Sequence, residues 1–299
     1  MLTNTVMILA EDGTKMHGLH YKVEEASSRL VIHVHGMAGN FYENSFIERI
    51  AEITNLNKID FLSFNNRGHD YIADCEKVIG SKTESFVAGC AYEKYVDCVF
   101  DLIGVMKWAI SEGYSSVFLQ GHSSGANKII YAYESLMKVE EISNVLKGLI
   151  LISPCDDIGI YHSETTSEER KKSHSLAQKY IDNLTGNTLM PLGTFFDYLL
   201  SAETFIECFK ENSPLDMFPY RKHTLEDTKL KEVKIPKLII FGNNGEFVLQ
   251  NMDEIQSMYL DSHIESYHIN VIDGANHSYR GKENQLAETV CNWIQELNI

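Results

Sequence analysis

The sequence predicts an α/β protein with a mostly parallel central sheet flanked by helices and with one helical insertion. Short apolar runs alternate with amphipathic segments of helical periodicity up to residue 154 and again after residue 233. Between residues 155 and 232 this alternation stops, and the stretch is polar, charged and helix-favouring. We therefore expect a core formed by residues 1–154 and 233–299, and a helical cap formed by residues 155–232.

The N-terminal elements are predicted from apolar patterns and from turn residues. Glu11, Asp12 and Gly13 separate two short strand patterns, which indicates a β-hairpin. A mostly apolar strand then ends at Gly36, and another ends at Asn65. The expected elements are strands at residues 6–10, 16–23 and 30–35, a helix at 44–54 and a strand at 59–64.

The remaining core elements follow the same pattern. We expect a helix at residues 92–111, because Cys98, Leu102 and Met106 belong to a series of apolar residues at helical spacing and Gly113 follows the last of them. After it we expect a strand that enters a turn at Gly121, a helix at 126–138, strands at 149–154, 237–242 and 267–272, and a final helix that includes 286–297.

The charge balance and the cysteines narrow the functional classes. The 299 residues include 26 Lys and Arg against 42 Asp and Glu, a formal net charge of −16, which disfavours nucleic acid and anionic membranes as partners. Charge interrupts every apolar run before it reaches the length of a bilayer, so no membrane span is expected. The six cysteines lack paired spacing, and the N-terminus lacks a basic secretory signal. We therefore expect free thiols and a cytoplasmic location.

The candidate nucleophile lies in a Gly-x-Ser-x-Gly segment, Gly121 to Gly125. An apolar strand runs into this segment and a helix-like segment follows, which is the sequence form of a nucleophile elbow. Only Ser123 has glycine both two residues before and two residues after it, as so tight a turn requires. Ser123 is therefore the expected nucleophile, and the backbone N–H of Ser124 is an expected oxyanion donor.

A general base and a second oxyanion donor can be placed on other predicted strand ends. His277 follows the last predicted strand, in a turn that contains Gly274, where it could take the proton of the serine. The loop after residues 30–35 contains Gly36 and Gly39, which permit a close approach of the backbone to a substrate. The Met37 N–H in this loop is the expected second donor.

These motifs, taken together, resemble the α/β-hydrolase superfamily over nearly the whole chain. The matching segments are His35-Gly36, Asn66-Arg67-Gly68-His69, Gly121-His122-Ser123-Ser124-Gly125 and Gly274-Ala275-Asn276-His277. The resemblance implies the α/β-hydrolase fold and a triad in the chain order serine, acid, histidine. Within the superfamily, the chain looks like small bacterial serine esterases with a helical cap. Residues 151–157 also resemble a branch that includes siderophore-ester hydrolases.

The resemblance leaves the acid of the triad open. The family usually has Asp three residues after the glycine that ends the seventh strand, and here that position is Gly245. Glu246 is one residue further on, and its longer side chain could reach His277. Some relatives take the acid from the end of the sixth strand, where this chain has Asp156 and Asp157. A third alternative is that no carboxylate fills this place, which weakens catalysis without abolishing it.

Two histidines also suggest a different chemistry. His33 and His35 are two residues apart on a predicted strand, so they share a face and could ligate a metal. A metal hydrolase would need further ligands at later strand ends and would leave the Gly121–Gly125 segment unexplained. We therefore expect no metal and a packing role for His33. The sequence contains no Gly-rich phosphate loop, and no cofactor is expected.

The expected function is hydrolysis of a carboxylic ester of small or medium size through an acyl-enzyme on Ser123. Thioesters and amides suit the same triad. A weakly catalytic or non-catalytic binding protein is the alternative, because Gly245 occupies the usual acid position and a fold does not determine a function. The sequence leaves a homo-oligomer open and does not identify the substrate.

Overall fold

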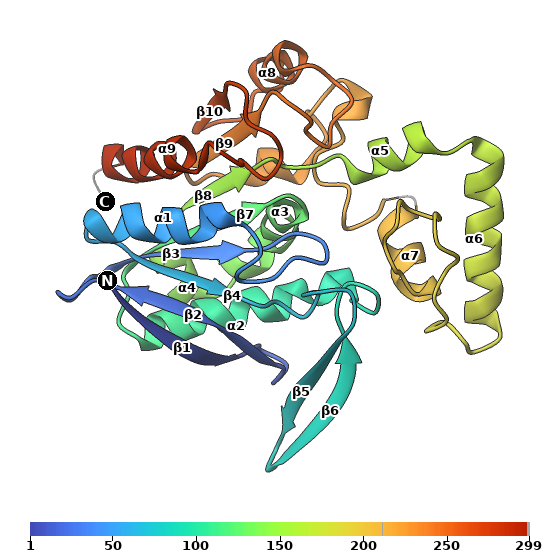
Figure 1. Ribbon diagram of the computed structural model, residues 1–299, viewed down its shortest axis with the longest axis horizontal. Helices are drawn as coiled ribbons and strands as arrows, with labels where there is room; N and C mark the ends of the chain where they lie inside the picture. The colour runs from blue at the N-terminus through green and yellow to red at the C-terminus, as the bar shows by residue number, and fades with distance from the viewer. Residues whose placement is uncertain (211, 298–299) are drawn as a thin grey trace.

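The computed structural model describes residues 1–210 and 212–297. The described residues form an eight-stranded sheet in the order β1-β2-β4-β3-β7-β8-β9-β10 (Figure 1). The strands from β4 to β10 in this order are parallel, while β2 runs antiparallel to β4 and to β1. The strand bounds are β1 Leu2–Leu9, β2 Lys15–Lys22, β3 Arg29–Val34, β4 Asp60–Phe64, β7 Ser116–His122, β8 Leu146–Ile152, β9 Lys237–Gly242 and β10 Tyr267–Ile272. The mostly parallel sheet and the N-terminal hairpin are confirmed.

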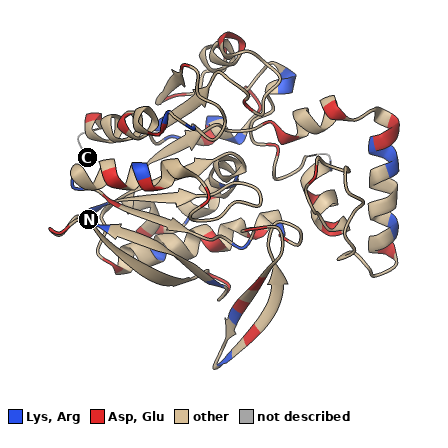
Figure 2. Ribbon diagram, viewed as in Figure 1, with Lys and Arg blue, Asp and Glu red and all other residues tan. Residues whose placement is uncertain are grey.

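Helices cover both faces of this sheet. One face packs against α1 (Ser45–Leu56) and α9 (Glu283–Glu296). The other face packs against α2 (Cys98–Ser111), α3 (Ser124–Met137), α4 (Glu140–Val145) and α8 (Met252–Asp261). Charged side chains lie mainly on the outer surfaces of the helices, and the central strands carry few (Figure 2). No helix in the described part of the chain is long and apolar enough to span a bilayer.

The apolar strands bury both of their faces, as β8 illustrates. Ile150 packs with α1 and α9, while Leu149 and Leu151 pack with the helices on the opposite face. All three side chains are fully buried. Burial of each such side chain contributes about 1.5–3 kcal/mol, which explains why continuous apolar runs rather than alternating ones mark these strands.

Three local features differ from the expected element order. A hairpin of β5 (Ala73–Ile79) and β6 (Lys82–Ala88) projects from the core (Figure 1). It is largely exposed and charged, so it has no apolar pattern that predicts it. The segment expected as a helix at 92–111 begins with a 3-10 turn at Tyr95–Asp97, and α2 follows it. The helices α4 and α8 are also absent from the expected elements.

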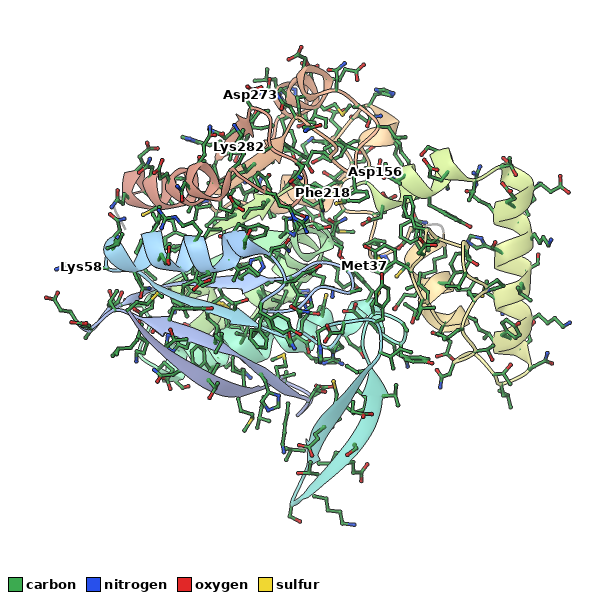
Figure 3. All side chains as sticks on the ribbon, viewed as in Figure 1. Met37, Lys58, Asp156, Phe218, Asp273 and Lys282 are labelled. Carbon is green, nitrogen blue, oxygen red and sulfur yellow. The ribbon has the colours of Figure 1, made fainter. Side chains whose placement is uncertain are left out.

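The expected cap range contains two packing units. The helices α5 (Asp157–Glu164), α6 (Ser167–Asp182) and α7 (Ala202–Phe209) lie to one side of the sheet (Figure 1) and share an aromatic cluster of their own. Residues from 217 onward join the main core instead, through Met217, Phe218 and Tyr220. Figure 3 shows Phe218 among the core elements, away from α6 and α7.

Candidate active site

Ser123 lies in a sharp turn between β7 and α3. Its backbone has φ 57° and ψ −135°, a strained conformation for a residue other than glycine. The turn is crowded, because a Cβ on Gly121 would lie 2.5 Å from the Ala126 nitrogen and one on Gly125 would lie 2.2 Å from the Val34 oxygen. The sequence therefore forms the expected tight turn, and Ser123 is half-buried at its apex.

His277 lies in the loop after β10 and contacts a carboxylate. Its Nδ1 lies 2.8 Å from Oε2 of Glu246, which follows β9. The Glu246 side chain is only 3% exposed, and its Oε1 accepts hydrogen bonds from the Gly242 N–H and the Ser153 hydroxyl, both at 2.7 Å. A neutral imidazole that donates from Nδ1 to this carboxylate keeps Nε2 free as a base.

Glu246 is held by a further layer of hydrogen bonds. The Tyr279 hydroxyl lies 2.8 Å from Ser153 Oγ and donates to the Ile240 carbonyl at 3.3 Å. Tyr279 is fully buried, and Ser153 has a φ of 47° at the end of β8. The carboxylate beside His277 is therefore fixed by groups from three neighbouring strand ends.

Asp156, the alternative acid, has other partners. Its Oδ1 accepts from the Gly159 N–H at 2.8 Å and from the Arg221 guanidinium at 2.5 Å. Its Oδ2 accepts from the Arg221 backbone N–H at 2.7 Å. Asp156 thus caps α5 and ties it to Arg221. The structure brings Glu246, and neither Asp156 nor Asp157, into hydrogen-bond contact with His277.

The Ser123 hydroxyl is turned toward Cys155. Ser123 Oγ lies 3.3 Å from Cys155 Sγ, and the described residues include no hydrogen bond between Ser123 and His277. Burial holds the pKa of the Cys155 thiol well above its usual range, so the thiol stays protonated. Catalytic hydrogen bonds often form only when substrate is bound, so this contact does not exclude Ser123 as a candidate nucleophile.

The backbone after β3 passes directly against Ser123. A Cβ on Gly36 would lie 2.8 Å from the Ser123 Cβ, so only glycine permits this approach. His35 holds the loop: its Nδ1 lies 2.9 Å from the Gly36 carbonyl, and its Nε2 accepts from the Asn66 N–H at 3.1 Å. Burial holds the pKa of His35 well below its ordinary value, so a neutral ring with one donor and one acceptor satisfies both contacts.

Two backbone N–H groups are available near Ser123, the candidate nucleophile. Met37 lines the same cavity as Ser123, and Ser124 is the first residue of α3. Neither N–H donates a backbone hydrogen bond to another described residue. The N–H groups of a first helical turn have no acceptor in their own helix and carry the positive end of the helix dipole. Figure 3 shows Met37 at the boundary between the sheet and the cap helices.

Two neighbouring rings fix the position of His277. His122 Nε2 donates to the His277 carbonyl at 2.8 Å, which links the elbow to the histidine loop. The Phe247 ring stands edge-on to the imidazole, with a centroid separation of 4.6 Å and an interplanar angle of 87°. Burial holds the pKa of His122 well below its ordinary value, so this ring packs as a neutral group.

A cavity of about 210 Å³ opens beside these groups. Ser123 and His277 both line it, together with the Gly36–Met37 backbone. The other lining residues are Glu43, Asn44, His122, Asp157, Phe195, Phe196, Tyr198, Phe247 and Ser278. The aromatic members come from the cap and from the segment after β9, so the cap forms one wall of the candidate site.

The histidines considered as metal ligands have other contacts. His33 is fully buried, and its Nδ1 lies 2.8 Å from Gln120 Nε2. Its ring packs against Phe46 and Phe61, in accordance with the expected packing role. Within residues 1–210 and 212–297, no group of three or more His, Cys, Asp or Glu side chains is arranged to hold a metal ion.

Several residues of the site were not found from the sequence. Phe247, Ser153 and Tyr279 act through contacts between distant segments, and no local motif marks them. Ser153 directly precedes a proline at a strand end, which was the one available signal. Glu43 and the cap aromatics reach the cavity only because of the way the cap packs.

Comparisons with known proteins extend this description. A family described as "Protein of unknown function (DUF1749)" matches residues 93–297. A comparison with curated protein sequences finds no match. The structure is similar to Est1E from Butyrivibrio proteoclasticus with bound ferulic acid, at 17% identity and a TM-score of 0.62 over 97% of this chain and 98% of that one.

Two further solved structures agree with this likeness. The Pyrococcus furiosus esterase Pf2001 is 19% identical, with a TM-score of 0.61 over 99% of this chain and 91% of that one. The siderophore hydrolase EstB from Aspergillus fumigatus is 14% identical, with a TM-score of 0.68 over 94% of this chain and 95% of that one. Likenesses of this extent show that the chain has the α/β-hydrolase fold.

Proposed function

The chain belongs to the DUF1749 family, and we propose that it is a serine hydrolase that cleaves a carboxylic ester through an acyl-enzyme. The observation that carries the proposal is the 2.8 Å contact between His277 Nδ1 and Glu246 Oε2, beside a cavity that Ser123 also lines. A serine on a strained turn, an oriented histidine and free backbone N–H groups are the parts that acyl transfer needs. Structural neighbours that are named esterases support the same class.

In the proposed acylation step, Ser123 Oγ turns from Cys155 toward His277 and attacks the ester carbonyl. His277 Nε2 takes the serine proton, and Glu246 stabilises the imidazolium that forms. The N–H groups of Met37 and Ser124 receive the negative charge of the tetrahedral intermediate. His277 then donates the proton to the leaving alcohol, and the acyl group remains on Ser123.

In the proposed deacylation step, water attacks the acyl-enzyme. His277 accepts a proton from the water and returns one to Ser123 Oγ as the carboxylic acid leaves. Glu246 is the proposed acid in both steps. Asp156 is proposed to be structural, because its oxygens are engaged by Arg221 and by the first turn of α5.

The cap is proposed to select the substrate. We assign to it the helices α5, α6 and α7, because their shared cluster contacts the partly buried Met37 and Ala38 of the loop after β3. A cavity of about 210 Å³ is small compared with the pockets of drug-sized ligands and favours an ester of small or medium size. The siderophore-ester branch stays the narrower proposal, supported by the likeness to EstB.

The remaining expectations are also proposals. A cytoplasmic location is supported by the six cysteines, all of which are free thiols. A small-molecule partner rather than a nucleic acid is supported by the net charge of −16.

One observation favours the second candidate, a weakly catalytic or non-catalytic binding protein. The Ser123 hydroxyl contacts Cys155 and is not hydrogen-bonded to His277 in the described residues. A protein held in this arrangement would bind an ester without cleaving it. Slow or absent turnover of every ester by folded protein, together with saturable binding, would support this candidate.

The experiment that tests the enzyme is a screen of p-nitrophenyl esters of increasing acyl length, with Ser123→Ala as the control. We expect turnover of the shorter esters and a loss of at least 10³-fold in kcat in the variant, since serine removal leaves only binding and oxyanion stabilisation. Equal turnover by Ser123→Ala would contradict the proposal. Matched thioesters and anilides then decide between ester, thioester and amide hydrolysis.

A further inference from the structure

The cavity beside Ser123 has an unusual distribution of charge. Glu43 and Asp157 are the two acidic residues among those that line it, and the lining contains neither lysine nor arginine. His122 also lines it, but burial holds its pKa well below the ordinary value, so it contributes no positive charge. The lining therefore offers two carboxyl groups and no lysine or arginine at the place where a substrate would bind, and burial raises the pKa of Glu43 above its ordinary value.

One carboxylate oxygen of Asp157 has no hydrogen-bond partner among the residues that the structure describes. Its Oδ2 is buried and lacks a hydrogen-bond partner, and the carboxylate forms no ion pair with any described residue. A buried polar atom without a partner is destabilising, because it has lost its hydrogen bonds to water, and it requires an explanation. The neighbouring Asp156, by contrast, is fully engaged with Gly159 and Arg221.

The position of Asp157 in α5 does not explain this arrangement. An acidic residue in a first helical turn is favoured by the helix dipole, but an exposed side chain serves that purpose and Asp156 already caps the helix. Burial and the nearby charge of Asp156 raise the pKa of Asp157 to about 7, while His277 acts in the opposite direction. A positive charge placed in the cavity would favour the ionised carboxylate.

Aromatic rings line the same cavity as these carboxylates. The ring centroids of Phe195 and Phe196 are 5.0 Å apart, and those of Phe196 and Phe247 are 6.4 Å apart. Tyr198 lines the cavity beside them. Such rings pack against an alkyl chain, and their faces also attract a cation. Carboxylates together with aromatic rings are the groups that recognise an alkylammonium ion.

We propose that this cavity binds the part of the substrate that carries a primary ammonium group, with Asp157 as its ion-pair partner and Glu43 as a second anionic group. The inference deepens the proposed function, on which it rests: the substrate is an ester with an amine in its acyl or its alcohol part. A primary ammonium has a full positive charge and three donors, so it can pair with the Asp157 carboxylate where that side chain lines the cavity. An anionic substrate would be repelled by both carboxylates.

The direct test measures binding and does not depend on turnover. Ligand-observed NMR titrations compare hexylammonium with hexan-1-ol, which has a similar chain but no charge. We expect hexylammonium to bind at least tenfold more tightly to the wild-type protein. The preference should fall below threefold in Asp157→Asn. In Glu164→Gln, which removes one negative charge from the exposed end of α5, the preference should remain.

Each other outcome of the titration overturns the inference. Equal affinity of the two ligands for the wild-type protein shows that the cavity does not select a cation, even if Asp157→Asn fails to fold. A tighter binding of hexan-1-ol shows that Asp157 recognises a neutral donor. A preference that survives unchanged in folded Asp157→Asn shows that another group binds the ammonium.

A kinetic comparison separates this inference from the proposed function. Ethyl 6-aminohexanoate and ethyl heptanoate differ by an ammonium in the acyl part, and 6-aminohexyl acetate and heptyl acetate differ by one in the alcohol part. We expect kcat/KM to be at least tenfold higher for the amine of one pair, and the preference to be lost in Asp157→Asn. If the protein hydrolyses both esters of each pair equally well, the ammonium-site inference is wrong but the proposed esterase function stands. Absence of any turnover and of Ser123 labelling contradicts the proposed function, while the binding test still decides the inference.

Discussion

His277 Nδ1 lies 2.8 Å from Glu246 Oε2, although Glu246 comes one residue after the position at which the resemblance places the acid. Gly245 occupies that position with a φ of 81° and open space around it. The additional methylene of glutamate compensates for the shift, and the contacts of Oε1 with Gly242 and Ser153 fix the carboxylate. A carboxylate can thus reach the histidine from a displaced position.

Replacement of this carboxylate distinguishes it from the alternative acid. Glu246→Gln should lower kcat on the order of 10³-fold to 10⁴-fold, because an amide neither stabilises the imidazolium nor enforces the tautomer. Asp156→Asn should change kcat by less than tenfold but lower the melting temperature, since Arg221 then keeps only one of its two ion-pair partners, Asp216. Steady-state kinetics and thermal unfolding measure both. The reverse order of the two effects on kcat would reassign the acid.

The close approach of Gly36 to Ser123 predicts a steric effect. Gly36→Ala places a Cβ 2.8 Å from the Ser123 Cβ and must displace either the nucleophile or the Met37 N–H. The rate of fluorophosphonate labelling should fall on the order of 10²-fold. Met37→Ala leaves the backbone donor in place and should retain labelling within tenfold. If Met37→Ala lowers the labelling rate more than Gly36→Ala does, the Met37 side chain rather than its backbone N–H supports the reaction.

The contact between Ser123 and Cys155 predicts that the thiol is not the nucleophile. Burial raises the pKa of Cys155 well above its usual range, so little thiolate exists at neutral pH. Cys155→Ala should keep kcat within about threefold of the wild-type value, and iodoacetamide should not inactivate the folded protein at pH 7. Inactivation by iodoacetamide that is prevented in Cys155→Ala would show that the thiol is reactive.

Buried histidines predict a loss of stability in mild acid. Burial lowers the pKa of His33 from 6.5 to about 3, so the unfolded chain binds more protons between these values. The free energy of unfolding is therefore largest above pH 6.5 and falls as the pH is lowered, by about 1.4 kcal/mol per pH unit for one such residue. Urea unfolding at pH 7 and pH 5 measures the difference.

The matched control for this pH effect is an exposed histidine. His33→Asn should reduce the loss of unfolding free energy between pH 7 and pH 5 by about 2 kcal/mol, whereas His268→Asn on the exposed side of β10 should leave it unchanged. The comparison concerns the pH dependence and not the absolute stability of either variant. An equal loss of unfolding free energy between pH 7 and pH 5 in the wild-type protein, His33→Asn and His268→Asn would show that His33 is already protonated or accessible in the folded state.

Much of the core follows from local patterns in the sequence. Continuous apolar runs such as residues 149–152 are buried on both faces, and this property alone predicts a parallel sheet between helices. Gly121, Gly125 and Gly36 mark places where backbone passes against backbone, so the tight turn around Ser123 can also be predicted from the sequence. These features depend on neighbours in the sequence or on steric limits of single residues.

The remaining features depend on long-range packing. The hairpin β5–β6 is largely exposed and charged, so no apolar period predicts it. The sequence makes Glu246 a candidate acid but does not decide between it and Asp156 or Asp157. The decision depends on the hydrogen bonds of Ser153 and Tyr279, which come from other strand ends. The orphaned Oδ2 of Asp157 is likewise visible only in the folded cavity.

The central claim is that Ser123 is a nucleophile activated by His277 and Glu246. Mass spectrometry of the intact protein and of its peptides after treatment with a fluorophosphonate tests it most directly. We expect one adduct on Ser123, no adduct in Ser123→Ala, and an adduct on the same residue in Ser124→Ala. Folded wild-type protein that forms no adduct, or an adduct that persists in Ser123→Ala, would contradict the claim.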